Sequence, residues 1–600
     1  MDDLRLVDRI QVEATGLRSG SGALTLGQLN VAKWVGDTDH NYFAIIDLVL
    51  HLPRSVTLDD LAEAFSLLMA RNESLRTRFT LGPEPRQHVA LTGEFPVDIY
   101  EYDPAAYPQI HVHGADGDTR STISPETRLE GALIRRLRET ALNIDDVLAR
   151  AAVAVSDGRP VAAAMVFSHL IADFRAKVAL DHQFTELAAD PANRHIGTPA
   201  HQPLDQAVAE QDPQSRRRAE RSLRFWEANL RWMPQAVYAV PVIAEPGPPL
   251  AGWLFSPPIA RVLSKIEARL GTGGSQVITA ALAAVLALRT DTPRFGWRMI
   301  GSNRIGARLH DYVGTMAQDC LVLVDAAVPT FDDLVRQCTT AILRASRLGP
   351  YDTVQLIAAC KVIERERGIL MHRDAALNDI SKYLSDTERT APEDIPEALL
   401  QIMKGPESVM HWWDPPVHQD ILTEFRVFQF GEMTALGLWT WDPSRLPPTE
   451  IEAFLRGTER LILAAAEGNV DMAKLSEVTG LVPVVRDPAT WLLLDSCWVE
   501  VSEVQRLLDD ALAPSASLLH VGTGADGQPS LIAYLAAGDH IRTPDQAHTA
   551  CLGTLSRRYT AMTPGWYVIC DGAPNDPLDL AAWQRQPVLA AGDGRAIAAD

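Results

Sequence analysis

Strand-like and helix-like segments alternate along this chain, and that alternation constrains its fold more than any other feature. The clearest case is the apolar run 161–167, which predicts a buried strand. It passes directly into a helical pattern that carries Val178, Phe184 and Leu187. Such segments bury their apolar sides when helices pack on a sheet. We therefore expect an α/β or α+β architecture.

Two further helices are predicted. Thr57 offers a hydroxyl for an N-cap and Asp60 an acid three residues later. Apolar residues then recur at helical spacing, at Leu61, Phe65, Leu68 and Leu75. A second helix is expected after the glycine-rich loop 271–274, with Ser275 as its N-cap. Its run 277–288 is apolar on every side, which predicts burial in a large core.

The length of the chain predicts several structural units. Six hundred residues correspond to about four units of ordinary domain size. The periodicity is interrupted between about 467 and 490, where we place the main domain boundary. The residues beyond it are expected to form a separate small unit, and the acidic, proline-containing stretch 390–397 an exposed loop.

Charge and apolar content exclude several classes of partner. The chain has 55 basic and 77 acidic residues, a net charge of −22, so nucleic acid and anionic membranes are not expected as partners. The longest apolar run is too short to span a bilayer, and the first residues lack a signal-peptide pattern, which favours a cytoplasmic protein. The 6 cysteines are too sparse for a disulfide scaffold or a zinc site, so we expect free thiols and no metal.

Several motifs that resemble catalytic or ligand-binding sequences are better explained as structural features. Residues 522–527 fit GxGxxG, but a strand-like segment follows them instead of a helix, which indicates a hairpin turn. His111 and His113 lie in a polar loop without a clear third metal ligand. The cluster 411–414 (His-Trp-Trp-Asp) is expected to pack in a core, although it could line a pocket.

One constellation is a stronger candidate. Residues 168–174 (SHLIADF) join the predicted strand to the following helix. A strand end is a rigid platform, and a turn there directs side chains into a cleft. His169 and Asp173 place an imidazole and a carboxylate on one short turn. On spacing alone, a structural pair is more common than a catalytic one, and both interpretations stay open.

This segment resembles the central HHxxxDG motif of the condensation domains of nonribosomal peptide synthetases. Ser168 stands for the first histidine, His169 for the second, Asp173 for the aspartate and Phe174 for the glycine. Other family signatures follow in the expected order. They are Leu26-Gly27-Gln28 with Trp34, the stretch 71–79 (RNESLRTRF), Phe225-Trp226, Asn303-Arg304 with 313–318 (VGTMAQ), and Trp441-Asp442-Pro443.

The resemblance implies two chloramphenicol-acetyltransferase-like lobes that form a V with a central tunnel. The lobes are expected at residues 20–200 and 201–478. Residues 486–590 resemble the small C-terminal subdomain of adenylation domains, with Arg486-Asp487 and 498–504 as the hinge and first helix. The catalytic lysine of that subdomain is absent, because no lysine occurs after Lys474. We therefore expect a small α+β remnant that does not activate an amino acid.

The resemblance also implies roles for individual residues. His169 would act on the amine as a general base or by positioning it, and Asp173 would be structural with Arg304 as its partner. Four further residues are expected at the substrate site, together with Arg304: Ser168, Phe174, Gly314 and Gln318. Phe174 in the glycine position could narrow the tunnel.

The implied reaction joins an acyl thioester on an acyl or peptidyl carrier protein to an amine, with ester formation less expected. The carrier acts in trans and supplies the phosphopantetheine arm, so no bound cofactor is expected. The amine comes on a small molecule or on a second carrier. The alternative is an inactive condensation-like scaffold that recruits a carrier protein or a tailoring enzyme. His169 with Asp173 favours the enzyme, whereas Phe174 and the tail without lysine favour the scaffold.

Overall fold

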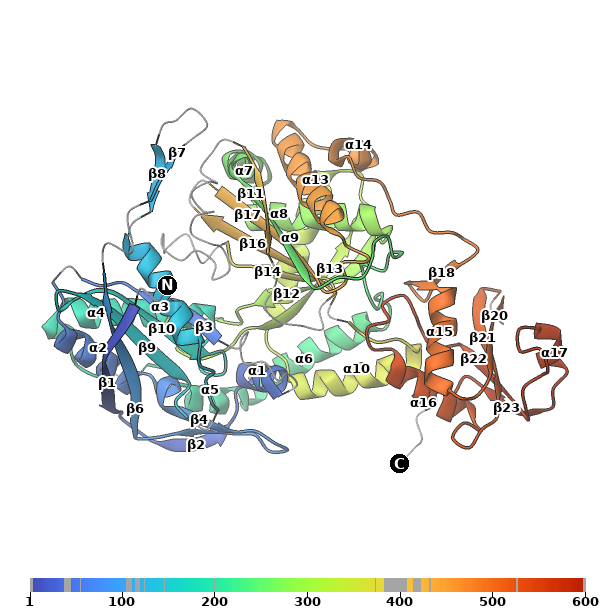
Figure 1. Cartoon of the computed structure of the whole chain (residues 1–600), viewed down its shortest axis with the longest axis horizontal. Helices are drawn as coiled ribbons and strands as arrows, with labels where there is room; N and C mark the ends of the chain where they lie inside the picture. Colours follow the sequence, from blue (N-terminus) through green and yellow to red (C-terminus); the bar gives the residue numbers. More distant parts are fainter. Residues whose placement is uncertain are drawn as a thin grey trace.

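The computed structural model describes residues 4–36, 45–53, 55–103, 110–113, 119–123, 125–144, 146–197, 200–372, 374–381, 407–413, 422–430, 433–524 and 527–596. Three large groups of buried apolar side chains form the cores of an N-terminal lobe, a C-terminal lobe and a small C-terminal domain. These lie at the left, centre and right of Figure 1. The loop that the sequence predicts at 390–397 lies outside the described residues.

The N-terminal lobe is built on a five-stranded sheet with the order β1-β6-β9-β10-β3. β10 pairs antiparallel with β9 and β3, whereas β6 and β9 run parallel. The lobe comprises β1 (Leu4–Thr15), β2 (Gly20–Ala23), α1 (Leu26–Gly36), β3 (Ile45–Leu50), α2 (Leu58–Arg71), η1 (Glu73–Arg76), β4 (Thr77–Thr80), β5 (Arg86–Val89), β6 (Thr92–Tyr102), β7 (Ile110–His113), β8 (Thr119–Ile123), α3 (Pro125–Arg138), β9 (Ala149–Ser156), β10 (Arg159–Ser168), α4 (Phe174–Ala189), η3 (Pro191–Asn193) and α5 (Pro203–Glu210).

The predicted helix after Thr57 is present as α2. Thr57 and Asp60 form a reciprocal capping box at its first turn, as the sequence indicates. The ring of Phe65 packs between those of Phe95 and Phe184, which joins α2 to the sheet and to α4. The prediction that Leu75 extends this helix is wrong. α2 ends at Arg71, and Leu75 lies in the short 3₁₀ helix η1.

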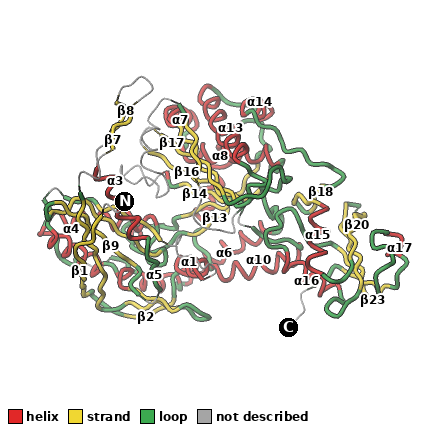
Figure 2. The backbone as a smooth tube through the Cα atoms, in the orientation of Figure 1, coloured by secondary structure: helices red, strands yellow, loops and turns green. Residues whose placement is uncertain are grey.

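The C-terminal lobe follows the long helix α6 (Pro213–Leu230), and its seven-stranded sheet has the order β13-β12-β14-β16-β17-β11-β15. Both large sheets appear as yellow layers in Figure 2. The lobe comprises β11 (Leu250–Ser256), α7 (Pro257–Leu270), α8 (Gly274–Thr290), β12 (Arg294–Gly301), η4 (Ala307–Leu309), β13 (Gln318–Asp325), α9 (Phe331–Leu348), α10 (Thr353–Arg367), β14 (Ala376–Asp379), β15 (Val409–Trp413), β16 (Thr423–Phe430), β17 (Met433–Thr440), α13 (Pro448–Glu467), η5 (Met472–Lys474) and α14 (Leu475–Thr479).

The apolar helix α8 lies at the centre of this lobe, as its sequence predicts. Its residues from Val277 to Ala287 are buried against α7, α9, α13 and α14. The N-cap prediction is wrong, because Gly273 is the capping residue and Ser275 lies inside the first turn. There the hydroxyl of Ser275 donates to Asp379 instead. Among the described residues no single helix is long and apolar enough to cross a membrane; only α7 and α8 taken together, bent by 100°, meet that length and composition.

The small C-terminal domain contains a hairpin and a four-stranded mixed sheet with the order β20-β21-β22-β23. β20 and β21 pair antiparallel on either side of 524–528, which confirms the hairpin predicted for the GxGxxG segment. The domain comprises β18 (Trp491–Leu494), β19 (Cys497–Glu500), α15 (Val501–Leu512), β20 (Ser517–Thr523), β21 (Pro529–Ala536), α16 (Pro544–Thr554), β22 (Trp566–Cys570), α17 (Leu580–Gln584) and β23 (Val588–Gly592). Its first helix begins at Val501, so Trp498, expected near the start of that helix, lies in β19.

This domain is attached to the C-terminal lobe by an extensive contact. Buried Arg367 at the end of α10 donates to the carbonyls of Leu230 and Met233, 2.7 Å each, and to Asp495 of the small domain at 2.5 Å. Ile369 of the lobe belongs to the core of the small domain. The thiols are free, as expected: four are buried, and Cys320 and Cys360 are half-buried.

Candidate active site

The turn that carries His169 connects β10 to α4. β10 ends at Ser168, whose carbonyl accepts from the Ile171 amide at 3.0 Å and whose hydroxyl accepts from the Leu170 amide at 3.3 Å. These bonds close the chain tightly after a buried strand. His169 is therefore presented, half-buried, at the strand end. Ser168 keeps the turn together from a buried position, so its role in the structure is local.

Asp173 is the N-cap of α4 and also the main polar link between the lobes. Its Oδ1 accepts from the Ala176 amide at 2.9 Å and from the guanidinium of Arg304. Its Oδ2 accepts from the Met316 amide at 2.9 Å. Asp173 is 2% exposed. Because both of its oxygens are engaged and buried, its carboxylate holds the turn and is not placed for proton transfer.

Arg304 is the predicted partner of Asp173, and the ion pair is present. Its other contacts are with its own loop: it donates to the carbonyls of Tyr312 at 3.0 Å and Gly314 at 2.9 Å. The guanidinium thus fixes the loop 304–316 in the form that reaches Asp173. Gly314, expected at the substrate site, contributes its backbone carbonyl to this network.

The imidazole of His169 faces the loop of the other lobe. Its Nδ1 lies 3.4 Å from the hydroxyl of the buried Thr315. A hydroxyl can donate to this nitrogen or accept from it, so the contact fits either tautomer. The ring is thereby held from the C-terminal lobe although its backbone belongs to the N-terminal lobe. His169 and Asp173 are placed at one junction, as their spacing suggests.

Two segments named by the family resemblance support the same loop. α1 approaches it so closely that a Cβ on Gly27 would collide with the carbonyl of Thr315. In η1, the hydroxyl of Ser74 donates to the carbonyl of Val313 at 2.7 Å. Segments distant in sequence therefore meet at residues 313–316. The side chain of Trp34, the remaining part of the first signature, lies outside the described side chains.

Gln318 is placed in a structural network. Its Nε2 donates to the carbonyl of Tyr351 at 2.9 Å, and its Oε1 accepts from the Tyr351 amide at 3.3 Å. Asn303, in the left-handed region with φ 54°, donates to the same Oε1 at 3.3 Å. Gln318 is 2% exposed. Its two hydrogen bonds to Tyr351 fasten the loop after α9 to β13. Gln318 also donates to the carbonyl of Leu26 of α1 at 3.4 Å.

Phe174 crosses the space between the lobes. Its half-buried ring packs against an aromatic cluster on the C-terminal lobe and lies 5.2 Å from the ammonium of Lys177. We call this cluster the aromatic wall. Its buried members are Ala251, Trp253, Phe255, Phe428, Met433, Ala435 and Trp439, with half-buried Trp413 and Trp441 beside them. Phe174 therefore occupies the side of the site that glycine would leave open.

The aromatic wall was not predicted as part of the site. Alternation along β11 and β17 places its residues on one face of the sheet, while Leu254, Leu436 and Leu438 point to the helical core. The indole N–H groups of Trp253, Trp439 and Trp441 have no hydrogen-bond partner in the described structure. Trp413 of the 411–413 segment packs on Trp439, as core packing predicts. Period-two alternation of aromatics in 251–255 was the available signal.

A buried carboxyl group behind the site was also missed. Glu210 at the end of α5 accepts from the Leu26 amide at 2.7 Å and from Gln206 at 2.8 Å. Burial raises the pKa of Glu210 to about 7. Burial likewise raises the pKa of the nearby Tyr312, whose ring lies 5.3 Å from the Arg304 guanidinium. Glu210 thus holds the first turn of α1, which in turn contacts Thr315.

No protein-family model and no curated protein matches this sequence. Solved structures do. A condensation domain that mediates chain release from the enacyloxin polyketide synthase is 20% identical, with a TM-score of 0.53 over 78% of this chain and 85% of that one. SgcC5 from Streptomyces globisporus is 15% identical, with a TM-score of 0.53 over 74% and 99%.

A third similar structure is the starter condensation domain of rhizomide synthetase. It is 13% identical, with a TM-score of 0.53 over 76% of this chain and 96% of that one. The three comparisons cover 85%, 99% and 96% of the similar structures and leave about a quarter of this chain uncovered. This chain therefore has the fold of the condensation domains of nonribosomal peptide and polyketide synthetases.

Proposed function

We propose that this protein forms an amide bond between a carrier-bound acyl thioester and an amine, in trans, in natural-product biosynthesis. The amine nitrogen attacks the thioester carbonyl carbon, and a tetrahedral intermediate forms. Its collapse breaks the carbon–sulfur bond and releases the carrier thiol. The proton lost by the amine passes through the His169 imidazole to the leaving sulfur, so that atoms and charge balance. An alcohol in place of the amine would give an ester by the same route.

The observation that carries this proposal is the arrangement of His169. Its imidazole is half-buried at a strand end, contacts the opposite lobe through Thr315 and stands beside a carboxylate whose oxygens are fully used. The contact with Thr315 helps to fix the position of the ring. A positioned imidazole serves as general base, or as a hydrogen-bonding group for the amine and the oxyanion.

The test is a condensation assay in trans read by intact-protein mass spectrometry. Carrier proteins loaded with candidate acyl groups are mixed with amines and this protein. We expect acyl loss from the carrier and a new amide, with the rate about 10²–10⁴-fold lower for His169→Ala. His310→Ala is the matched control, because among the described residues this exposed histidine of the C-terminal lobe pairs only with its neighbour Asp311. Equal rates for wild type and His169→Ala would remove His169 from the reaction.

A second candidate function is the inactive scaffold, and Phe174 favours it. Its ring packs on the aromatic wall beside His169, in the position where the related motif has glycine. If this ring closes the passage, wild type will bind loaded carrier without turnover. Phe174→Gly would then restore acyl transfer that depends on His169. Turnover by wild type, unchanged or slowed in Phe174→Gly, would leave the enzyme as the function.

A further inference from the structure

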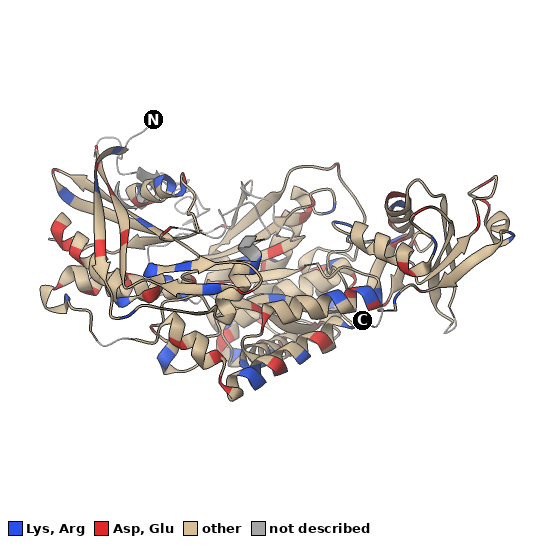
Figure 3. Ribbon diagram, turned by 90° about the horizontal axis from the view of Figure 1, so that it is seen from below, with Lys and Arg blue, Asp and Glu red and all other residues tan. Residues whose placement is uncertain are grey.

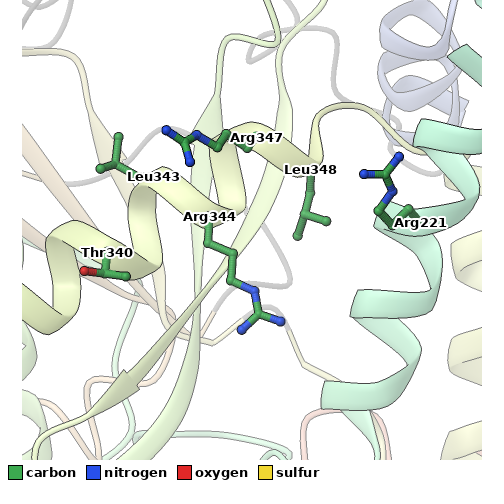
Figure 4. A pocket seen from close by; sticks show the side chains of 6 residues that line it. All are labelled: Arg221, Thr340, Leu343, Arg344, Arg347 and Leu348. Atoms are coloured by element: carbon green, nitrogen blue, oxygen red, sulfur yellow. The ribbon is translucent and has the colours of Figure 1, made fainter. Parts of the chain in front are cut away.

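A groove lies between α6 and α9, away from His169. It has a volume of about 330 Å³ and is lined by Arg221, Thr340, Leu343, Arg344, Arg347 and Leu348. Arg221 comes from α6 and the others from α9; Arg344 and Leu348 extend into the space between the two helices (Figure 4). The groove therefore combines guanidinium groups with two leucine side chains.

Three arginines gather in the groove. The net charge is −22, and basic and acidic residues are interspersed on the helices seen in Figure 3. Arg194, by contrast, pairs with both Asp60 and Glu63. Within the described residues, neither Arg221 nor Arg344 nor Arg347 forms an ion pair with a carboxylate. Unpaired guanidinium groups gathered in one hollow attract an anionic ligand.

Apolar side chains narrow the chemistry of that ligand. Leu343 is 51% exposed at the groove, and Leu348 is half-buried between the helices. A small free anion would leave Leu343 in water. A helix that carries carboxylates beside apolar side chains would cover the leucines and pair with the arginines at once.

The groove has firm walls. The carbonyl of Arg347 accepts from the Arg218 guanidinium at 3.1 Å, and the carbonyl of Gly349 accepts from the hydroxyl of Ser222 at 3.1 Å. The Arg344 guanidinium lies 4.8 Å from the centre of the Phe225 ring. Since the helices are fastened before any ligand arrives, binding needs little reordering.

A short segment connects the groove to the lobe junction. After α9 the chain reaches Tyr351. The carbonyl of Tyr351 accepts from the Gln318 side chain, and its amide donates to the same side chain. Two residues later the hydroxyl of Thr353 donates to Asn30 of α1 at 3.2 Å. α1 is the helix that contacts the loop beside His169. A protein bound in the groove is thus adjacent to the elements that build the site.

We propose that this groove docks an acidic, amphipathic helix of a partner protein. This proposal depends on the proposed function in one respect: the partner that we expect is the carrier protein that brings the acyl group. The carboxylates of that helix pair with Arg221 and Arg344, and its apolar side chains cover Leu343 and Leu348. The overall negative charge of the chain repels acidic proteins elsewhere, which directs them to this surface.

The test uses a fluorescein-labelled helical peptide of about 18 residues, with Glu along one edge and Leu along the adjacent face. Fluorescence anisotropy measures its binding to the full chain. We expect Arg221→Glu and Arg344→Glu each to weaken binding by about tenfold, and raised salt to weaken it further. Arg216→Glu makes the same charge change on α6, about 140° around the helix from Arg221, and is expected to change affinity less than about twofold.

Three results would overturn the proposal. One is equal weakening by the groove variants and Arg216→Glu, which would indicate general electrostatics. Another is absence of peptide binding by wild type, and the third is displacement of the peptide by inorganic phosphate at constant ionic strength. Thermal unfolding shows that the variants are folded. Binding needs no turnover, so failure of the condensation assay with normal peptide binding would remove the proposed function and leave the docking surface.

Discussion

Two junctions hold this molecule together, and they are built differently. The lobes meet around one buried carboxylate, Asp173, which takes bonds from its own helix, from Arg304 and from the Met316 amide. The C-terminal lobe and the small domain have separate apolar cores, but Ile369 of the lobe packs into the core of the small domain. Arg367 and Gln235 donate to backbone carbonyls of the small domain there.

The difference indicates which junction carries chemistry. At the lobe junction the half-buried His169 lies close to Asp173 and its buried hydrogen bonds. At the second junction backbone carbonyls are capped and apolar side chains interlock, as in the interior of one domain. The small domain has a core of its own and is fastened to the C-terminal lobe by Ile369, Arg367 and Gln235. The predictions below disturb each junction separately.

The largest effect is expected from Arg304→Met. It leaves the buried Asp173 without its cation, so the free energy of unfolding should fall by about 3–5 kcal/mol. Denaturant unfolding measures this change. The control is Arg336→Met, which breaks the exposed pair with Asp333 (arginine side chain 60% exposed) and should cost less than about 1 kcal/mol. A similar loss in both variants would contradict the central role of the Asp173–Arg304 pair.

A smaller and pH-dependent effect is expected at Glu210, which supports the lobe junction through α1. Its pKa is raised from 4.5 to about 7 in the folded chain. The folded state therefore binds this proton more tightly, and its stabilisation is present below pH 4.5 and lost as pH rises through about 7. Because of Glu210, we expect the free energy of unfolding of wild type to fall by up to about 3 kcal/mol over this pH range. Glu210→Gln should lack this fall. Stability curves for both proteins that stay parallel from pH 4.5 to 8 would contradict it.

The smallest effect is expected at the second junction. Gln235 donates to the carbonyls of Tyr559 at 3.1 Å and Ala561 at 2.8 Å. Gln235→Leu leaves both without this donor and should destabilise the contact by about 2 kcal/mol. Hydrogen exchange should become faster in 559–563, while His169-dependent turnover stays at the wild-type rate. Loss of turnover together with faster exchange would show that the two junctions are coupled.

Two helices could be predicted from sequence because their own residues determine them. The capping box of Thr57 and Asp60 and the all-round apolar run in α8 determine their own helices. The N-cap of α8 was misplaced because Gly273 takes the extended conformation at that position without a side-chain bond. The end of α2 was also missed, because Asn72 leaves the helix while the apolar spacing continues to Leu75.

The site was predictable only in part. His169, Asp173 and Arg304 came from a motif and its resemblance, and the ion pair is present. Thr315 could not be found this way, because its contact with His169 depends on how two lobes meet. Glu210 was missed for the same reason, since its partner Leu26 is 184 residues away. The sequence of the aromatic wall is typical of an ordinary hydrophobic core. Only the structure shows which face of the sheet its residues share.

The N-cap of α4 has a consequence for how such sequences are compared. One carboxylate caps the first turn of a helix and joins two lobes, so the fold needs Asp173 whether or not the protein is active. Its presence in a relative therefore marks a folded junction, not a working enzyme. The more informative positions are 169, whose imidazole we propose acts on the amine, and 174, whose ring packs on the aromatic wall. A lineage that loses its chemistry should drift there first, while the aspartate and its arginine stay fixed as a pair.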